Sequence, residues 1–412
     1  MPKPVLFVCS NQNHVRIFTP VARILERGGA NGLAIRWLTL DPYYHHGAEE
    51  TLRDHGWQER ISLPRPPGDT GTPWEGNALT RMRILRHGRT AVRWCLDTAR
   101  PSVVALGNDL GVLERLFLVE ARRRAIPSLL VQDGVIALEP PSGASVADHR
   151  RLVRALLTAL GLRLPDARPY GLNGADQIAV MGEAFARHLI AYGVPEERIA
   201  ITGQPRYDDL HALKRGTATP KPLSVPLPAG HKIILFTSQP YVRYQMCSVG
   251  EARRIWQTVI NGVKELGEGH HLVAKLHPAE DVAWTRRWLA DVLAADCTLT
   301  RDDDVLSLAF RADALVTVIS TTALEALYLE KPVILLDACG VKQPIPYVPS
   351  GAALEARTAA DLTLRLKEAL YDESVRARLA QARRAFVPRH LDIADGRASE
   401  RVAELVRTLA GA

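Results

Sequence analysis

The sequence predicts an α/β protein of two domains, each built on a parallel β-sheet with helices on both faces. Short β-branched runs alternate with helix-like segments, and repeated strand–helix–strand units are typical of parallel sheets. A stretch rich in proline, lysine and small residues interrupts this alternation at 211–231. The 412 residues, 47% hydrophobic and 24% charged, suffice for two or three domains with sizeable cores.

The first predicted domain spans 1–210. Its first helix is expected to end at Gly28 and Gly29, because glycine commonly follows a helix. Residues 135–175 are less regular and rich in proline. The expected strands are 4–10, 33–40, 102–107, 127–134, 177–182 and one that begins at 198, and the expected helices are 15–29, 111–125 and 183–194.

The second predicted domain spans 232–412 and follows a linker at 211–231. It repeats the alternation of strands and helices, and its tail from about 361 is expected to be helical and highly charged. The expected strands are 232–239, 270–278, 314–320 and 332–337, and the expected helices are 250–266, 279–293 and 322–330.

The chain is basic, with a formal net charge of +7 and a pI of about 9.2. This charge favours anionic partners such as nucleotides, phosphates or an anionic membrane surface, although a basic surface also serves solubility. Residues 81–94, RMRILRHGRTAVRW, form the most basic stretch. We interpret it as a solvated helix face, with a membrane-contacting amphipathic helix as the alternative. No compact Lys/Arg block of the nucleic-acid-binding type occurs, so nucleic acid is not an expected partner.

The five cysteines predict neither a zinc site nor a disulfide framework, because none forms a CxxC pair. The N-terminus has the pattern of a short strand and not of a signal peptide, and no apolar run has the length of a transmembrane helix. We therefore expect a cytoplasmic protein, with the inner face of the membrane as the place of any peripheral contact.

Polar side chains follow three strands of the second domain, where a parallel sheet binds ligands. Hydroxyls and a histidine suit phosphate oxygens, and a carboxylate one helical turn further suits ribose hydroxyls. The predicted donor-nucleotide site therefore contains Ser238, Gln239, Lys275, His277, Pro278, Ser320, Thr321, Thr322 and Glu325.

Each of these residues also has an interpretation without a ligand. Thr322 and Glu325 have the spacing of a capping box, which closes a helix start by itself. His277 and Ser238 are also suited to turns. Ser320 and Thr321 are not needed for a cap and are the better evidence for a phosphate. If Glu325 caps the helix it turns back to the Thr322 N–H, and if it binds ribose it faces the cleft.

Several chemistries are disfavoured because their motifs are missing. The sequence contains no GxGxxG loop after its first strand and no Walker A lysine loop, GxSxG or HExxH motif. The His-His pairs at 45–46 and 270–271 are weak evidence for a metal. We expect a metal-independent mechanism without a cofactor, in which positive protein groups stabilise a departing phosphate.

KLHP (275–278), followed by ISTTALEALYLEKPVI (319–334), resembles the C-terminal domain of GT-B glycosyltransferases. The resemblance is closer to bacterial enzymes of surface-polysaccharide assembly, namely sialyl- and Kdo-transferases and CDP-glycerol glycerophosphotransferases. ITGQPRYDDL (201–210) and DGRASERVAELV (395–406) are similar to segments of the same group. The resemblance covers most of the chain, and 232–406 best. It implies the GT-B fold, two Rossmann-like domains whose parallel sheets face a central cleft, with the donor nucleotide on the second domain.

UDP-N-acetylglucosamine 2-epimerases share this layout. GND (107–109), QDG (132–134), KLHP and the pair Ser320 and Glu325 align with elements of their pattern. However, NQNHVR stands where those epimerases carry an arginine after the first strand, and the paired glycines after the C-terminal serine are missing. These differences disfavour epimerisation.

The resemblance places the acceptor in the N-terminal domain, where an inverting transferase needs a general base. The candidates at strand ends are Asp133, Asp109 and His14. Asp133 is favoured because it lies between a strand and a glycine. Asp109 is equally suited to cap the following helix, and His14 to begin the helix after the first strand.

Our leading hypothesis is a glycosyltransferase that moves a sugar from a nucleotide-sugar donor to a carbohydrate or glycoconjugate acceptor. Surface-polysaccharide biosynthesis is the expected setting, and transfer should survive chelation by EDTA. Two alternatives remain. A nucleotide-sugar epimerase or hydrolase would release an altered or free sugar without an acceptor. A non-catalytic nucleotide-binding module would tolerate the loss of Asp133 and Asp109.

Overall fold

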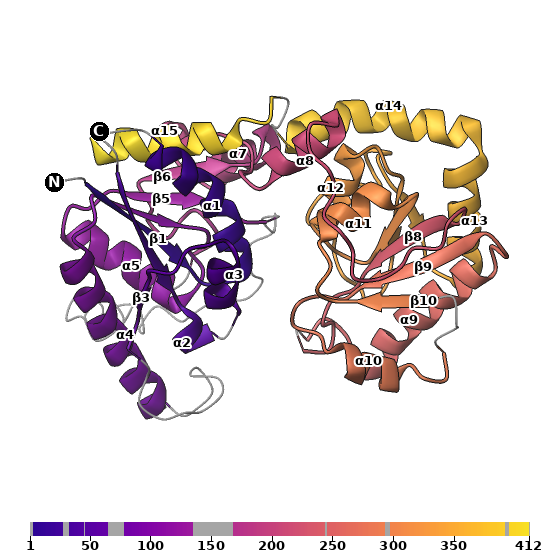
Figure 1. The fold of residues 1–412 in the computed structure, drawn as a ribbon, viewed down its shortest axis with the longest axis horizontal. Coiled ribbons are helices and arrows are strands. Elements are labelled where there is room, and N and C mark those ends of the chain that lie inside the picture. Colours follow the sequence, from indigo (N-terminus) through magenta and orange to yellow (C-terminus); the bar gives the residue numbers. More distant parts are fainter. Residues whose placement is uncertain are drawn as a thin grey trace. The chain divides into compact units, whose positions relative to one another are not determined.

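The computed structural model describes residues 3–27, 33–44, 46–64, 78–134, 168–243, 245–292, 297–391 and 395–411. The predicted helix end at 28–29, most of the irregular segment 135–175, and His45 lie outside these ranges. The chain divides into two compact units, Met1–Asp208 with Leu391–Ala412 (unit 1) and Asp209–His390 (unit 2). Figure 1 shows the elements of both units, each with a sheet and its helices.

Unit 1 contains a parallel sheet in the order β3-β2-β1-β4-β5-β6-β7, the doubly wound arrangement that places a ligand-binding switch point between β1 and β4. Its strands are β1 Pro4–Cys9, β2 Ala34–Thr39, β3 Ile61–Ser62, β4 Val103–Leu106, β5 Ser128–Val131, β6 Gln177–Val180 and β7 Ile199–Ile201. Its helices include α1 Gln12–Glu26, α2 Asp41–Tyr44, α3 Ala48–Asp54, α4 Ala78–Ala99, α5 Val112–Arg123, α7 Glu183–Ala191 and α15 Ala398–Ala410.

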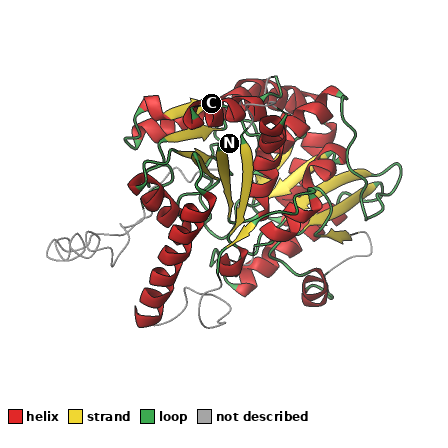
Figure 2. Ribbon diagram, turned by 60° about the vertical axis from the view of Figure 1, so that its left-hand side comes forward, coloured by secondary structure: helices red, strands yellow, loops and turns green. Residues whose placement is uncertain are grey.

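Unit 2 repeats the same strand order, β10-β9-β8-β11-β12-β13, again with every pair parallel. Figure 2 shows the strands, in yellow, with helices, in red, packed around them. The strands are β8 Lys232–Thr237, β9 His270–Lys275, β10 Cys297–Thr300, β11 Ala314–Thr317, β12 Val333–Leu336 and β13 Leu354–Ala356. The helices include α8 Tyr207–Arg215, α9 Val249–Lys264, α10 Val282–Trp288, α11 Val305–Arg311, α12 Thr322–Tyr328, α13 Ala359–Tyr371 and α14 Glu373–His390.

The predicted two-domain α/β class with parallel sheets is confirmed, and the expected strands and helices all correspond to observed elements. The structure adds elements that the sequence pattern did not indicate, namely α2, α3, β3, α8, β10, α11 and β13. Within the described ranges, no helix combines the length and the apolar character needed to cross a membrane.

The observed division of the chain differs from the predicted domains at two places. The predicted linker 211–231 begins inside α8 and falls within unit 2, and the tail 391–412 belongs to unit 1. The physical reason for the second difference is the apolar face of α15. Val402, Ala403 and Val406 are buried in the same core as Phe7 and Phe18 of unit 1. This burial removes apolar surface from water that a separate tail would expose.

Two segments that carry the family resemblance, 201–210 and 395–406, contact each other in unit 1. The carboxylate of Asp208 accepts hydrogen bonds from the backbone N–H groups of Ala398, at 2.9 Å, and Ser399, at 2.8 Å, at the start of α15. Arg401 Nε donates to the Thr202 carbonyl at 2.8 Å. The carboxylate thus satisfies helix-start donors and holds α15 in unit 1.

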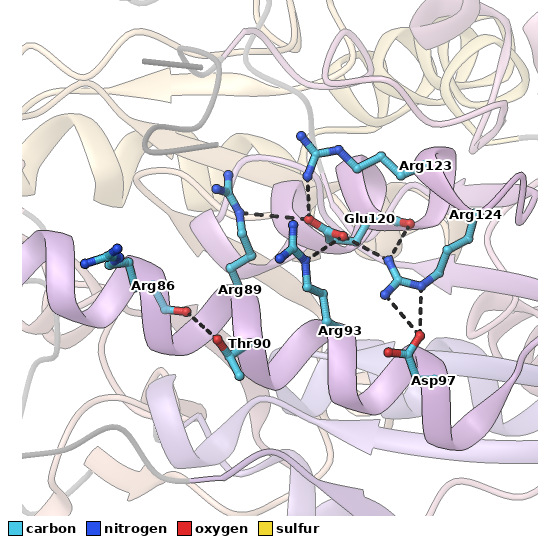
Figure 3. Close-up of polar contacts among 8 residues, drawn as sticks. All are labelled: Arg86, Arg89, Thr90, Arg93, Asp97, Glu120, Arg123 and Arg124. Carbon is cyan, nitrogen blue, oxygen red and sulfur yellow. Dashed lines mark hydrogen bonds and ion pairs between the residues drawn. The ribbon is translucent and has the colours of Figure 1, made fainter. Parts of the chain in front are cut away.

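The basic stretch 81–94 lies in α4, where part of its charge is used internally. The Glu120 carboxylate of α5 is 2% exposed and pairs with Arg93 at 3.0 Å, and also contacts Arg89. Figure 3 shows these side chains around it, together with Arg123 and Arg124 of the α5 end. Arg123 and Arg124 form ion pairs with the Glu120 carboxylate at 3.0 and 2.9 Å. These arginines therefore join α4 to α5. This pairing favours neither the solvated helix face nor the membrane-contacting helix as the interpretation of residues 81–94.

Replacing Glu120 with glutamine is expected to lower the free energy of unfolding by about 1–3 kcal/mol at pH 7, because the surrounding arginines lose a charged acceptor. Burial opposes ionisation of Glu120, but hydrogen bonds from Arg93 and Arg124 lower its pKa below the usual 4.5. A depressed carboxyl pKa stabilises the fold above the unfolded pKa, and this contribution is lost as the pH falls through the folded pKa. Denaturant unfolding of both proteins at pH 7 and in acid would measure this loss.

The control for this experiment is Asp97→Asn, since Asp97 pairs with Arg124 but has an exposed side chain. Exposed pairs contribute little to stability, so the control should unfold like the parent protein. A stability difference between Glu120→Gln and the parent that does not shrink in acid would contradict the expected role of the ionised carboxylate.

Candidate functional site

The three predicted catalytic candidates lie at the C-terminal edge of the first sheet. His14 lies in the first turn of α1 just after β1, Asp109 follows β4, and Asp133 follows β5. Because β1 pairs with β4 and β4 with β5, the ends of these strands are neighbours. This edge includes the switch point at which doubly wound sheets bind ligands.

His14 and Asp133 are in direct contact, with Nε2 of the ring 3.1 Å from Oδ2 of the carboxylate. The backbone N–H of Ser10 donates to His14 Nδ1 at 3.2 Å, and the Ser10 hydroxyl lies 3.1 Å from the same atom. Since Nδ1 accepts, the neutral ring carries its proton on Nε2 and donates it to Asp133. The exposed fraction is 0% for the His14 side chain and 24% for that of Asp133. Asp133 is therefore the member that solvent and a ligand can reach.

Local structure holds His14 in place. Asn11 is the N-cap of α1, and its side chain accepts from the His14 N–H at 3.1 Å. Gly107, at the end of β4, lies against the imidazole, and a Cβ there would come within 2.6 Å of Nε2. This crowding excludes any larger residue at 107 without movement of the ring. The alternative that His14 begins a helix is confirmed, and the Asp133 contact exists in addition.

The loop that carries Asp133 is fixed by a buried glutamine pair. Gln132 Oε1 accepts from the Met181 N–H at 3.0 Å, and Gln132 Nε2 donates to the Gly134 carbonyl at 2.8 Å. The side-chain amide of Gln204, from the QPRYDD segment, donates to the Gln132 carbonyl. Sequence reasoning missed Gln132 and Gln204 as positioning residues, although both lie inside motifs that it had singled out.

Asp109 has a different environment from the pair. It is fully buried, and its Oδ2 accepts from the backbone N–H groups of Gly171 at 3.0 Å and Asn173 at 3.3 Å. The suggested N-cap role is wrong, because Gly111 occupies the N-cap of α5. Burial raises the pKa of Asp109 to about 6, although the hydrogen bonds oppose this shift. Asp109 thus anchors the 168–174 segment, and its burial separates it from solvent.

The free energy of unfolding of Asp109→Asn, compared with that of the parent, is expected to increase as the pH rises from about 4 to above 6. The raised carboxyl pKa, about 6 against the usual 3.8, means that the native state holds its proton over a range in which the unfolded chain has lost it. The free energy of unfolding of the parent therefore falls as the pH rises across this window. The asparagine variant has no carboxyl group at 109 and lacks this pH dependence. Unfolding free energies of both proteins from pH 4 to 8 would measure it. A pH-independent difference would show that Asp109 ionises normally.

The predicted donor-site residues of unit 2 follow three neighbouring strands. Thr237, at the end of β8, pairs with Lys275 of β9 on one side and with Thr317 of β11 on the other. The expectation that these strands are neighbours in one parallel sheet is confirmed. Ser238, His277 and Ser320 follow the three ends and lie along one edge of the sheet.

Glu280 joins two of these strand ends. Its Oε2 accepts from the buried Ser238 hydroxyl and from the His277 N–H at 2.8 Å. Burial raises the Glu280 pKa, while these hydrogen bonds and the nearby charge of Lys275 oppose the shift. His277 Nδ1 accepts from the Ala279 N–H at 3.1 Å, which confirms the turn interpretation for that nitrogen. Sequence reasoning missed Glu280, which the HPAE pattern places one turn after the histidine.

The capping-box interpretation of Thr322 and Glu325 is wrong. Thr321 is the N-cap of α12 and makes no side-chain cap hydrogen bond. The Thr322 N–H donates to the Ser320 hydroxyl at 3.1 Å, and that hydroxyl also bonds Thr322 Oγ1 at 3.0 Å. Glu325 is 1% exposed within α12. The serine and threonines thus form a local hydroxyl cluster at the strand end, and Thr321 itself is half-buried.

The remaining predicted donor residues differ in exposure. Lys275 is nearly buried, and its ammonium donates to the carbonyls of Leu276, at 2.9 Å, and Arg301, which accounts for it without a ligand. Gln239 is half-buried and Pro278 is exposed. None of the predicted donor residues lines the cavity of about 510 Å³ found in unit 2, which lies among α8, α12 and α14.

Known proteins share this architecture. UDP-GlcNAc 2-epimerase from Neisseria meningitidis bound to UDP-GlcNAc has a TM-score of 0.67 at 14% identity, over 98% of this chain and 100% of that one. The S. aureus MnaA-UDP co-structure has a TM-score of 0.66 at 16% identity, over 99% and 97%. The glycosyltransferase SnogD from Streptomyces nogalater has a TM-score of 0.59 at 16% identity, over 99% and 100%. At these identities the likeness shows the fold, which is GT-B.

A comparison with curated protein sequences finds no match. The model of one protein family, CDP-Glycerol:Poly(glycerophosphate) glycerophosphotransferase, matches residues 180–408, more than half of the chain. Fold and family together define a transferase of the GT-B class. The chain belongs to the CDP-Glycerol:Poly(glycerophosphate) glycerophosphotransferase family, as the resemblance of the KLHP and ISTTALE segments predicted.

Proposed function

We propose that this chain transfers a group from a nucleotide-diphosphate-linked donor to an acceptor hydroxyl, with Asp133 as general base. The observation that carries the proposal is the 3.1 Å contact between Asp133 and the buried His14 at the edge of the first sheet. The partly exposed carboxylate takes the acceptor proton while the imidazole N–H holds its other face. His14 is then a positioning residue, and Asp109 anchors the neighbouring loop.

The donor belongs at the edge of the second sheet. The hydroxyls of Ser320 and Thr321 and the ring of His277, which are all partly exposed, are suited to phosphate oxygens, whereas Glu325 is buried within α12. Positive and hydrogen-bonding protein groups then stabilise the departing phosphate, so the chemical step needs no divalent cation.

Family membership favours a CDP-linked glycerol donor over a nucleotide sugar. In that case the acceptor oxygen forms a bond to the phosphorus that carries the glycerol. The bond from this phosphorus to the bridging oxygen breaks, and CMP leaves with the electron pair. The acceptor proton goes to Asp133. With a nucleotide sugar, the same base would serve attack on the anomeric carbon.

The test is a thermal-shift panel of CDP-glycerol, CMP and UDP-, GDP- and CMP-linked sugars, followed by product analysis with the stabilising donor. A specific ligand raises the melting temperature by mass action. We expect CDP-glycerol and CMP to stabilise, and Ser320→Ala to weaken the shift while Ser350→Ala, in a turn after β12, does not. Transfer should continue without Mg²⁺ and with EDTA. No stabilisation by any member of the panel would contradict the proposal.

The second candidate, a nucleotide-sugar 2-epimerase, is supported by the fold of structures such as the Neisseria meningitidis enzyme. It predicts an epimerised or free sugar from UDP-GlcNAc in the absence of any acceptor. The same product analysis without acceptor separates it from transfer. A non-catalytic module would bind a nucleotide without turning over any donor.

A further inference from the structure

Three side chains from separate parts of unit 2 converge at one place. Cys247 lies in the loop between β8 and α9, Glu251 in the first turn of α9, and Cys339 in the loop after β12. The two sulfurs and one carboxylate oxygen all lie within 4.8 Å of one another. All three residues are partly exposed, so ions in solution can reach them.

The surrounding structure holds these three groups in position. Glu251 Oε2 accepts from the N–H of Ser248 at 2.8 Å and from its hydroxyl at 2.7 Å, in the capping box of α9. These two hydrogen bonds from Ser248 restrain the carboxylate, as the partners of metal ligands commonly do. Cys339 has a left-handed φ of 60°, which is uncommon for a residue other than glycine. Such backbone positions persist where the surroundings require them and are frequent at functional sites.

The loop between β8 and α9 that contains Cys247 also contains a buried tyrosine hydroxyl. Tyr241 is 2% exposed, and its hydroxyl has no hydrogen-bond partner among the described residues. A buried polar group normally has a partner, often an ordered water.

We propose that Cys247, Glu251 and Cys339 bind a divalent cation of the Zn²⁺ class, with water in the fourth position. Two thiolates and one carboxylate form a ligand set that Zn²⁺ accepts, and soft thiolates favour it over Mg²⁺ or Ca²⁺. Tetrahedral bonds of about 2.3 Å place two sulfurs about 3.8 Å apart, so small side-chain rotations suffice. A disulfide between the cysteines is the rival, and it would involve the two sulfurs without the Glu251 carboxylate.

The ion would join the loops after β8 and β12, which lie on either side of β11 in the sheet. Gln343, in the loop that contains Cys339, donates from Nε2 to the Val318 carbonyl at 2.6 Å, two residues before Ser320. The site is therefore structural, and it orders the loops beside the strand that ends in the hydroxyl cluster. It does not take part in the chemical step, and its existence does not depend on the proposed function.

The test uses the full chain, reduced and freed of metal, and titrated with Co²⁺ as a spectroscopic probe. We expect one Co²⁺ per chain with the absorption of thiolate ligation, which Zn²⁺ then displaces. Cys247→Ser and Cys339→Ser should each weaken binding about tenfold or more, comparable to or beyond the loss of an outer-shell partner. Glu251→Gln should also weaken it, while glutamine preserves the capping box.

Cys297→Ser is the matched control, because Cys297 is equally half-buried and lies on β10, outside the group. It should bind Co²⁺ like the parent. Zn²⁺ should raise the melting temperature of the parent and the control but not that of Cys247→Ser or Cys339→Ser. The proposal is overturned by the absence of saturable Co²⁺ absorption, or by binding that survives loss of both cysteines. Isolation of a metal-free protein with a Cys247–Cys339 disulfide, unable to bind Co²⁺ after reduction, also overturns it.

Discussion

Replacing Asp133 with asparagine is expected to lower kcat for group transfer by about 10²–10⁴-fold, the usual contribution of a general base. Asparagine keeps the size of the side chain and can still accept the His14 Nε2–H, so the geometry of the pair should survive. KM for the donor should change little, because the donor residues lie on the second sheet. Steady-state kinetics with the stabilising donor and a saturating acceptor would measure both parameters.

The control for Asp133→Asn is Asp97→Asn, which removes an exposed carboxylate of the same unit that pairs with Arg124. Its kcat should equal that of the parent. If Asp133→Asn retained kcat within a few-fold of the parent while the control did too, Asp133 would not be the base. His14→Gln then becomes informative, because a fall in kcat for that variant alone would transfer the role to the imidazole.

Replacing Gly107 with alanine is expected to lower kcat by about 10²-fold without unfolding the protein. The added Cβ would lie 2.6 Å from Nε2 and 2.7 Å from Cγ of His14, whose ring is fully buried. The imidazole must therefore move and loosen its 3.1 Å contact with Asp133. A displacement of about 1 Å in a catalytic arrangement commonly costs about this factor.

The matched glycine control is Gly250→Ala, since the nearest atom to a Cβ at that position is 3.9 Å away. It should leave kcat unchanged. The effect of Gly107→Ala should also largely disappear in a His14→Asn background, because the shorter side chain leaves room for the methyl group. Such non-additivity is expected of residues in contact. Additive losses in the double variant would show that Gly107 acts on something other than His14.

Much of the architecture follows from local patterns in the sequence. The β-branched runs that end at Cys9, Thr237 and Thr317 are buried strands because a parallel sheet covered by helices requires apolar residues on both of its faces. Polar residues directly after such runs must lie at the edge of the sheet, so Asp133, His277 and Ser320 were predictable candidates. The KLHP and ISTTALE segments also predicted the family correctly.

Contacts between distant residues needed the tertiary structure. The pairing of His14 with Asp133 joins positions 119 residues apart, and only the order of β1, β4 and β5 brings them together. The tail helix α15 packs in unit 1 because its apolar face matches that core, a complementarity that periodicity does not encode. Spacing likewise gave no sign that Cys247 and Cys339 meet, because they follow strands that are not neighbours in the sequence.

The sequence by itself therefore determined the class of fold, the strand ends that bear chemistry and the family, because these depend on local periodicity and on short motifs. The tertiary structure alone decided which of those side chains stay accessible and which are taken up by internal hydrogen bonds, because burial and partners depend on every element packed around them. Asp109 became a buried anchor, Lys275 bonded to backbone carbonyls, and Thr322 bonded to Ser320 without forming a capping box. Asp133 remained partly exposed, and its carboxylate contacts the fully buried imidazole of His14.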